Sequence, residues 1–240
     1  MGVAGDVAVL AGGGLDSSVL VGELSRTARR VVPIVIRQGL QWEAVERYWL
    51  RRFLTALGAA NVAPPVVLDM PATDLYGAHW STGARAVPGS SSADRAVYLP
   101  GRNLLLIAKA AVYCTQHRIG TLALGTLAGN PFSDAQPSFF RLYERLIQQA
   151  LGTPLRIIQP YARLSKTDVI RHGKTMPLGQ TLSCLQPVGR RHCGRCNKCR
   201  ERQLAFRAAG IPDPAQVAAP RALVPSLTEP MNRLRMCRAD

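Results

Sequence analysis

The apolar positions of this chain fall into short continuous runs that alternate with stretches of helical spacing. Residues 6–11 and 31–36 are apolar runs of the length typical of buried strands. The same reasoning predicts strands over residues 66–70, 121–125 and 155–159, and helices over residues 16–25, 43–57, 103–117, 137–151 and 165–172. Strands that alternate with helices favour a parallel sheet covered on both faces. The predicted fold class is therefore α/β, with a Rossmann-like parallel sheet.

The last quarter of the chain departs from this alternation. Residues 181–210 contain four of the six cysteines and end in a predicted helix. Beyond residue 211 the chain is proline-rich and weakly patterned, so we expect a loosely packed tail. We therefore divide the chain into an α/β domain over residues 1–180, a four-cysteine module with its following helix over 181–210, and a basic, proline-rich tail over 211–240.

A chain of 240 residues, 47% of them hydrophobic, is large enough for one α/β domain with a buried core and a small appendage. Its start lacks a basic segment followed by a long apolar run, and no stretch approaches the roughly 20 apolar residues of a membrane-spanning helix. We therefore expect a soluble, cytosolic protein with no membrane partner. Cys114 lies in an apolar helical pattern and is predicted to be a small buried hydrophobe.

The formal net charge of +15 favours an anionic partner, either nucleic acid or a small molecule, although an arginine-rich composition alone also produces such a charge. Part of the excess is local, because residues 186–207 contain one acid, Glu201, beside Arg190, Arg191, Arg195, Lys198, Arg200, Arg202 and Arg207. Four thiolates on one divalent ion carry a net charge of about −2, which some of these cations balance. Nucleic acid is thus a partner that the sequence allows but does not favour.

A glycine-rich loop joins the first predicted strand to the first predicted helix, and it contains Ala11, Gly12, Gly13, Gly14, Leu15, Asp16, Ser17 and Ser18. Glycines at this point let the backbone approach a phosphate closely, and successive N–H groups form an anion-binding nest. The start of the helix adds a partial positive charge, and the two serines add hydroxyl donors. The loop is neither a Walker A loop nor the dinucleotide fingerprint of spaced glycines. We predict that it binds the phosphates of a nucleotide.

The loop closely resembles that of the PP-loop ATP pyrophosphatases, whose usual form is Ser-Gly-Gly-x-Asp-Ser. Gly13, Gly14, Asp16 and Ser17 match this form, whereas Gly12 replaces the leading serine. The replacement removes one hydroxyl donor and keeps every backbone amide. The resemblance implies an enzyme that cleaves ATP to AMP and pyrophosphate.

Four cysteines have the spacing of a metal site: Cys184, Cys193, Cys196 and Cys199. Cysteines separated by two residues place their sulfurs on one side of a tight turn, as tetrahedral zinc requires at about 2.3 Å per bond. A reducing compartment disfavours disulfides, whereas an iron–sulfur cluster is a serious alternative because CxxCxxC also occurs in cluster proteins. We predict a closed, structural Zn²⁺ site that contributes directly to folding.

Taken together, the loop and the cysteines resemble one family, the 7-cyano-7-deazaguanine synthases, which are PP-loop enzymes that make the nitrile precursor of queuosine-type bases. The resemblance covers residues 7–209 and implies a fold like that of the adenine nucleotide alpha hydrolases. It rests on ordered motifs: Gly13-Gly14-Leu15-Asp16-Ser17, Leu99-Pro100-Gly101-Arg102-Asn103, Leu164-Ser165-Lys166, and Thr181-Leu182-Ser183-Cys184 followed by Cys193-Gly194-Arg195-Cys196-Asn197-Lys198-Cys199.

The resemblance implies that a carboxylate becomes a nitrile in two stages that each consume ATP. The carboxylate of 7-carboxy-7-deazaguanine attacks the α-phosphate of ATP and expels pyrophosphate, and ammonia then displaces AMP to give an amide. A second ATP activates the amide oxygen, and loss of AMP leaves the nitrile. The implied ligands are ATP with Mg²⁺, the deazapurine carboxylate and ammonia, beside Zn²⁺. We also expect a homo-oligomer, namely a dimer.

Cations are needed where negative charge develops on the phosphorus, and Arg102 and Lys166 are the candidates. Asp16 is the candidate for shaping the loop or engaging Mg²⁺. Lys166 follows Ser165, which begins a capping-box pattern in which Asp168 stands in for the usual Glu or Gln. The pattern places Lys166 in the first turn of a helix.

The chain departs from the family at two motifs. The family commonly has Gln-Arg-His after its second strand, where this chain has Gln38-Gly39-Leu40. The family also has Tyr-Pro-Asp-Cys-Arg after its fourth strand, where this chain has Asn-Pro-Phe-Ser-Asp-Ala over residues 130–135, and only Asp134 matches. An acid at position 134 would accept hydrogen bonds from the amino and ring N–H groups of a guanine-like base. The missing His and Arg affect the expected substrate more than the ATP chemistry.

Three hypotheses follow. The first is the nitrile-forming synthase or a paralogue that acts on a related deazapurine acid. The second is a PP-loop enzyme that activates another carboxylate or a tRNA base. The third is a basic zinc-module protein that binds nucleic acid and has no enzymatic activity. The glycine-rich loop favours the first two.

Overall fold

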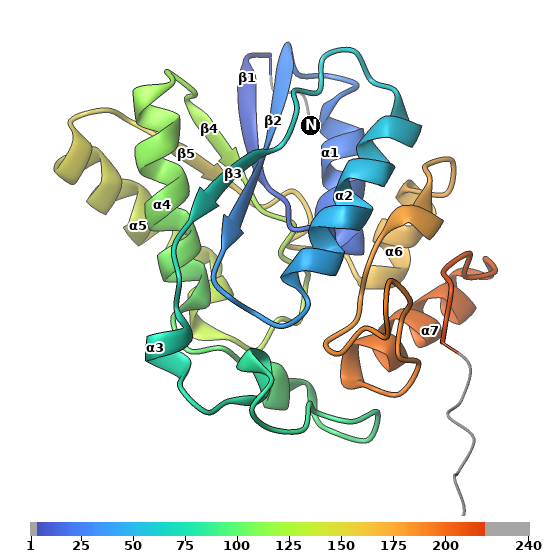
Figure 1. Cartoon of the computed structure of the whole chain (residues 1–240). Coiled ribbons are helices and arrows are strands. Elements are labelled where there is room, and N and C mark those ends of the chain that lie inside the picture. The colour runs from blue at the N-terminus through green and yellow to red at the C-terminus, as the bar shows by residue number, and fades with distance from the viewer. Residues whose placement is uncertain (1–3, 219–240) are drawn as a thin grey trace, which may run out of the picture.

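The computed structural model describes residues 4–218, and five parallel strands form its central sheet (Figure 1). They are β1 (Asp6–Leu10), β2 (Arg30–Arg37), β3 (Val66–Asp69), β4 (Thr121–Ala123) and β5 (Arg156–Ile158), in the spatial order β3-β2-β1-β4-β5. In the parallel register Val7 pairs with Val31 on one side of β1, and Ala8 pairs with Leu122 on the other. The predicted α/β fold with a Rossmann-like parallel sheet is confirmed.

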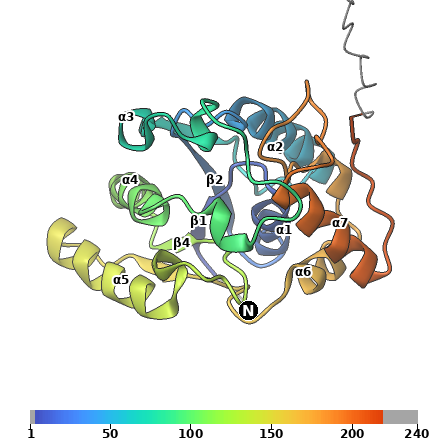
Figure 2. The same ribbon diagram turned by 90° about the horizontal axis from the view of Figure 1, so that it is seen from below.

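Helices cover both faces of the sheet (Figures 1 and 2). One layer contains α1 (Leu15–Leu24), α2 (Glu43–Leu57), α6 (Lys166–His172) and α7 (Asn197–Ala209), and the other contains α4 (Arg102–Gln116) and α5 (Pro137–Leu151). The short helix α3 (Thr73–Tyr76) and the 3₁₀ turns at Trp80–Thr82 and Asp94–Val97 lie beyond the carboxyl edge of the sheet. No helix among residues 4–218 is long and apolar enough to cross a membrane.

The strands bury both of their faces, which explains their continuous apolar runs. Successive side chains of a strand point to opposite faces, so Val7 and Val9 pack with α1 while Ala8 packs with α4 and α5. Cys114 lies in the second layer with no exposed surface, and its burial raises the pKa of the thiol to about 12. It is the buried hydrophobe that its sequence pattern predicts.

The elements agree closely with the sequence patterns. Helices α2 and α5 have the predicted bounds, and the strands begin or end within two residues of prediction. The predicted capping box is also present at α6, because the Ser165 hydroxyl accepts from the Asp168 backbone N–H while the Asp168 carboxylate accepts from Ser165 N–H. The division into three segments stays a prediction.

The start of the tail differs from the loose packing that we expected. Asp213 forms a two-pronged ion pair with the buried Arg202, and residues 216–218 pair with the backbone of His192. These contacts attach residues 213–218 to the four-cysteine module, although every residue of 211–218 stays half-buried or exposed. The rest of the predicted tail, residues 219–240, lies outside the described residues.

Candidate active site

The candidate site lies where the strand order reverses, between the carboxyl ends of β1 and β4. Parallel α/β sheets bind ligands at such switch points. A cavity of about 470 Å³ opens there, lined by the glycine-rich loop, the starts of α4 and α6, the segment after β4 and the four-cysteine module. Segments that are far apart in the sequence therefore meet in one cavity.

The backbone of the glycine-rich loop requires glycine at position 13, the second of its three glycines. Gly13 has a φ of +116°, and a Cβ atom there would lie 2.1 Å from the backbone carbonyl oxygen of Glu46. No residue with a side chain fits this close contact between the loop and α2. Gly14 then precedes α1 and accepts the first helical hydrogen bond from Ser18 N–H at 3.1 Å. The loop thus places the start of α1 at the cavity.

The predicted phosphate-binding residues divide into two groups. Gly14, Leu15, Asp16 and Ser17 line the cavity, whereas Ala11, Gly12, Gly13 and Ser18 lie behind it. The Ser18 hydroxyl and Asp16 Oδ1 are both buried and have no hydrogen-bond partner among residues 4–218. Buried polar atoms are normally paired, and Asp16, unlike Ser18, lines the cavity, so Asp16 Oδ1 fits a site that a polar ligand completes.

Lys166 and Asp16 meet at the cavity wall. Lys166 Nζ lies 3.1 Å from Asp16 Oδ2 and 3.1 Å from Glu201 Oε1, and the lysine side chain is only 11% exposed. Burial disfavours the charged lysine most strongly, but the charges of Asp16 and Glu201 outweigh burial and raise its pKa. Lys166 is therefore held as a cation beside the loop.

Two further residues of this charged cluster escaped the sequence assignment, Glu201 and Lys198 of α7. Lys198 Nζ lies 2.7 Å from Glu201 Oε2, so Glu201 bridges two lysines. Burial alone would raise the pKa of Glu201, but Lys166 and Lys198 together lower it to about 2. A single acid within a basic stretch was the available sequence clue.

Arg102 and Asp134 also line the cavity, at the start of α4 and beside it. Arg102 Nε donates to Gln38 Oε1 at 3.1 Å. Asp134 is buried, and its Oδ2 accepts from Asn103 N–H at 3.0 Å, which caps the start of α4. The hydrogen bonds of Asp134 within the described part of the chain go to its Oδ2 and to its backbone carbonyl, and none goes to Oδ1. One carboxylate oxygen is thus structural, and the other is free for a ligand.

Aromatic side chains form the part of the cavity that sequence reasoning missed. Trp42 and Trp80 stack with ring centroids 5.7 Å apart, and Tyr98 and Phe132 stack at 4.7 Å. All four line the cavity. They come from four separate loops and turns, so no local sequence pattern unites them. Flat aromatic walls suit a planar heterocycle.

Glu46 is another cavity residue that no motif indicated. It lies on α2 above the glycine-rich loop, and its side chain lines the cavity. Burial raises the pKa of its carboxyl to about 7, and the charge of Arg102 only partly counters that effect.

The four predicted metal ligands come together in the module. One ligand atom from each of Cys184, Cys193, Cys196 and Cys199 lies within 4.8 Å of all the others, and the sulfurs of Cys193 and Cys199 are 3.8 Å apart. Tetrahedral bonds of about 2.3 Å place sulfurs about 3.8 Å from one another. The arrangement therefore fits a metal site. Backbone N–H groups donate to two of the sulfurs, which stabilises thiolates.

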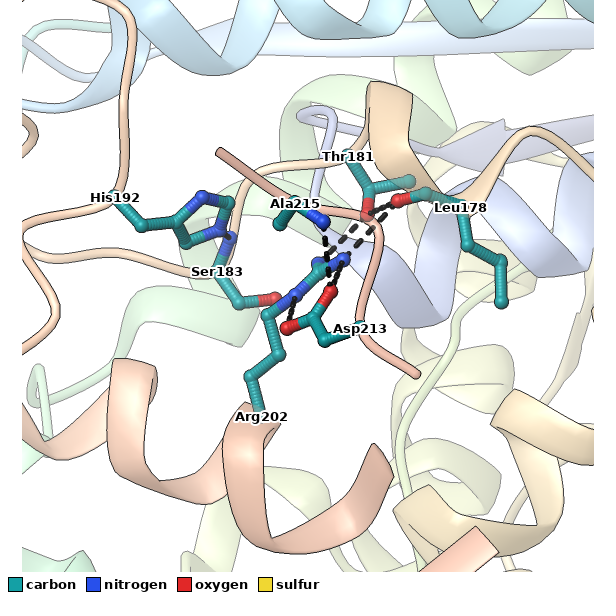
Figure 3. A network of polar contacts seen from close by, with 7 residues as sticks. All are labelled: Leu178, Thr181, Ser183, His192, Arg202, Asp213 and Ala215. Carbon is teal, nitrogen blue, oxygen red and sulfur yellow. Dashed lines mark hydrogen bonds and ion pairs between the residues drawn. The ribbon is translucent and has the colours of Figure 1, made fainter. Parts of the chain in front are cut away.

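A buried polar network around Arg202 ties the parts of this module together (Figure 3). Arg202 donates to Asp213, to the Thr181 hydroxyl at 2.8 Å and to the Leu178 carbonyl at 3.1 Å. Leu182, next along this segment, donates its N–H to the Gly13 carbonyl at 2.9 Å. The segment that leads to Cys184 is thus fixed to α7 on one side and to the loop on the other.

His192 belongs to the same network (Figure 3). Its Nε2 accepts from Ser183 N–H at 2.9 Å, so the proton of the neutral ring is on Nδ1. Burial, followed by the charge of Arg202, lowers the pKa of His192 to about 4. The ring is therefore neutral at pH 7 and holds the Ser183 backbone in place.

The fold and site define a class: an α/β protein with a glycine-rich loop at the switch point of a parallel sheet, joined to a module whose four cysteines fit a metal site. The family model described as queuosine biosynthesis protein QueC matches residues 6–210, and the chain belongs to this family.

Curated relatives agree with that assignment. The chain is 34% identical over 221 residues to a 7-cyano-7-deazaguanine synthase of Anaeromyxobacter sp., covering 86% of this chain and 93% of the relative. It is 29% identical to one of Methanothrix thermoacetophila, covering 88% and 98%. A solved structure of the predicted subunit of tRNA methyltransferase from Methanocaldococcus jannaschii superposes with a TM-score of 0.45 at 17% identity, covering 71% of this chain and 74% of the other.

Proposed function

We infer that this chain is an ATP-dependent synthase that converts 7-carboxy-7-deazaguanine and ammonia to 7-cyano-7-deazaguanine. Membership of the QueC family and the names of the curated relatives support this function. The observation that carries it is the convergence of three features in one cavity: the loop at Gly14–Ser17, the buried Lys166–Asp16 pair, and the aromatic wall. An adenylation needs each of these: a cradle for phosphates, a fixed cation and a surface for a planar base.

The loop and the lysine suit the first chemical step, in which a carboxylate oxygen attacks the α-phosphate of ATP and pyrophosphate departs. Amides at the start of α1 would bind the departing group, since helix starts favour phosphate. Lys166 and Arg102 would stabilise the charge that develops on the phosphorus. Asp16 Oδ1, which has no partner among residues 4–218, would hold Mg²⁺. That ion supplies charge neutralisation on the triphosphate.

The product of this step is an acyl adenylate. Ammonia attacks its carbonyl carbon, AMP leaves with one of the original carboxylate oxygens, and an amide remains. The amide oxygen then attacks a second ATP, again expelling pyrophosphate. Loss of the second AMP, with that oxygen and both amide protons removed, gives the nitrile. Both stages need the same phosphate cradle, so one site serves both.

Asp134 is our candidate for recognising the base. Its free Oδ1 would accept one hydrogen bond from the amino or ring N–H group, because its Oδ2 is occupied by Asn103. Gln38 Nε2 is also buried without a partner among the described residues and is available as a donor. The aromatic pair of Tyr98 and Phe132 would cover the ring face. These contacts replace those of the missing family His and Arg.

The metal of the module is Zn²⁺ in this proposal. Thiolates in a closed tetrahedral set favour zinc. A multi-iron cluster must seat several iron and sulfide ions between its cysteines, whereas ligand atoms within 4.8 Å of one another suit a single ion. The ion would hold Cys184, and through Leu182, two residues earlier, would help to fix the phosphate loop.

The test is a reaction with ATP, Mg²⁺, 7-carboxy-7-deazaguanine and ammonium, followed by mass spectrometry and nucleotide analysis. We expect 7-cyano-7-deazaguanine together with AMP and pyrophosphate. ATP cleavage that starts only with tRNA would instead support a tRNA-modifying PP-loop enzyme. RNA binding with a steep salt dependence and no ATP cleavage would support a nucleic-acid-binding protein.

A further inference from the structure

Position 12 is where the loop departs from the usual PP-loop form, and the structure shows what lies there instead. A Cβ atom built on Gly12 would lie 2.9 Å from Glu46 Oε2 and 3.5 Å from the carboxyl carbon. The carboxyl of Glu46 therefore occupies the space that a side chain at position 12 would fill. Glu46 lines the cavity, whereas Gly12 does not.

The Glu46 carboxyl has no structural task of its own. It makes no hydrogen bond or ion pair within residues 4–218, and its Oε1 lies 3.9 Å from the place that a Cβ atom on Gly14 would take. Glu43, one turn earlier on α2, is different: both of its oxygens accept backbone N–H groups, from Gln38 and Gly39. Glu43 thus stabilises the local backbone, whereas Glu46 lines the cavity.

We propose that Glu46 replaces the missing hydroxyl of position 12 and donates a hydrogen bond, as a neutral carboxylic acid, to a phosphate oxygen of ATP or pyrophosphate. The proposal rests on the proposed function, because it assigns a residue to the phosphate site of the same reaction. Glu46 would act as a binding and positioning group for the departing pyrophosphate. No bond to it is made or broken.

The charges around Glu46 favour the neutral acid at and below neutral pH. Burial raises its pKa to about 7, Arg102 of α4 opposes the rise, and the nearby Glu43 adds to it. The other charged groups that line this cavity are four acids and two cations: Asp16, Asp94, Asp134 and Glu201, with Lys166 and Lys198. An incoming phosphate adds negative charge and disfavours the carboxylate further. Binding should therefore take up a proton at Glu46.

The test measures pyrophosphate binding by titration calorimetry, with and without Mg²⁺, from pH 6 to pH 8.5. Glu46→Ala should bind about 10- to 100-fold more weakly at pH 6, the usual loss for one hydrogen bond to a charged group. Glu46→Gln keeps a donor and should restore most of that affinity. Because glutamine cannot ionise, the wild type should lose affinity relative to Glu46→Gln as the pH rises through 7. Buffers of different ionisation enthalpy should reveal extra proton uptake in the wild type alone.

A second pair of variants tests whether a serine hydroxyl at position 12 and the Glu46 carboxyl can substitute for each other. Gly12 has no positive φ, so serine fits its backbone and must displace only the flexible Glu46 carboxyl. Gly12→Ser should strengthen pyrophosphate binding in the Glu46→Ala background and give no gain in the wild type. Asp74→Asn removes an exposed acid on α3, outside the cavity, and controls for net charge.

Three results would overturn the proposal. The first is equal binding by wild type, Glu46→Ala and Glu46→Gln at every pH. The second is a serine effect at position 12 that is the same with and without Glu46. The third is weak binding by Glu46→Gln that appears only with Mg²⁺, which would make Glu46 a metal ligand. If the wild-type protein binds neither pyrophosphate nor ATP, that result would instead contradict the proposed function itself.

Discussion

The buried lysine at the phosphate loop provides the sharpest mutational test of the site. Lys166 Nζ contacts two carboxylates at 3.1 Å each, from Asp16 and Glu201. Replacing Lys166 with Met keeps most of the side-chain volume and leaves both carboxylates without this cation. Breaking a buried pair by removing one partner costs about 3–5 kcal/mol. For a protein of this size that loss lowers the Tm by about 6–20 °C, at roughly 2–4 °C per kcal/mol.

Lys198→Met is the matched control, because Lys198 contacts the same Glu201 but is 31% exposed. A partly exposed pair contributes only about 0.2–1 kcal/mol, so the control should unfold at nearly the wild-type urea concentration. Adding Glu201→Gln to Lys166→Met removes one of the two acids that lose the Lys166 cation, the one that Lys198 still contacts, and should recover part of the lost free energy of unfolding.

Activity should respond differently from stability. Loss of a cation that stabilises the transition state lowers kcat by about 10²–10³, so pyrophosphate release should stay low in the Lys166→Met/Glu201→Gln double variant even where stability returns. Urea unfolding and a pyrophosphate-release assay measure the two effects separately. Equal stability and activity of Lys166→Met and Lys198→Met would refute the assignment of Lys166.

Three further predictions concern other parts of the site. Asp16→Asn should keep the fold and lower pyrophosphate release by at least tenfold, since the variant loses a carboxylate from the phosphate loop; wild-type turnover would contradict this. Cys196→Ser should lose the metal and lower the Tm, because a structural site contributes to folding; unchanged metal content and unchanged melting would count against the site. Glu46→Gln should stabilise the ligand-free protein above pH 7 by at most about 3 kcal/mol, since each unit of difference between the folded and unfolded pKa corresponds to 1.36 kcal/mol. The folded state raises the pKa of Glu46 from 4.5 to about 7, so stability falls as pH rises through that range, and the advantage of the glutamine should vanish by about pH 4.5 in thermal melts.

The fold could be predicted from the sequence because its local patterns agree with its tertiary structure. Runs such as residues 31–36 are buried on both faces, and the capping box at Ser165 fixes the start of α6. The glycine-rich loop and the four cysteines were also readable, because each is contiguous or nearly so in the chain. Features that are encoded by residues close together in the chain can therefore be predicted from the sequence.

The rest of the site is assembled from distant segments, and no local pattern encodes it. The stacked Trp42 and Trp80 lie 38 positions apart and meet only in the folded chain. Glu46 looks like an ordinary polar position of an amphipathic helix until α2 packs on the loop. Asp213, within an unpatterned stretch, gave no indication that it pairs with Arg202 across the module. Such contacts depend on tertiary packing.

Oxygen transfer tests the central claim most directly, because adenylation moves a substrate oxygen onto AMP. The experiment uses 7-carboxy-7-deazaguanine with ¹⁸O in both carboxylate positions, unlabelled ATP, Mg²⁺ and ammonium, and mass analysis of the nucleotides. The proposed reaction predicts two AMP molecules per nitrile, each with one ¹⁸O, and unlabelled pyrophosphate. Label in inorganic phosphate together with ADP, or AMP without label, would contradict attack at the α-phosphate within this loop.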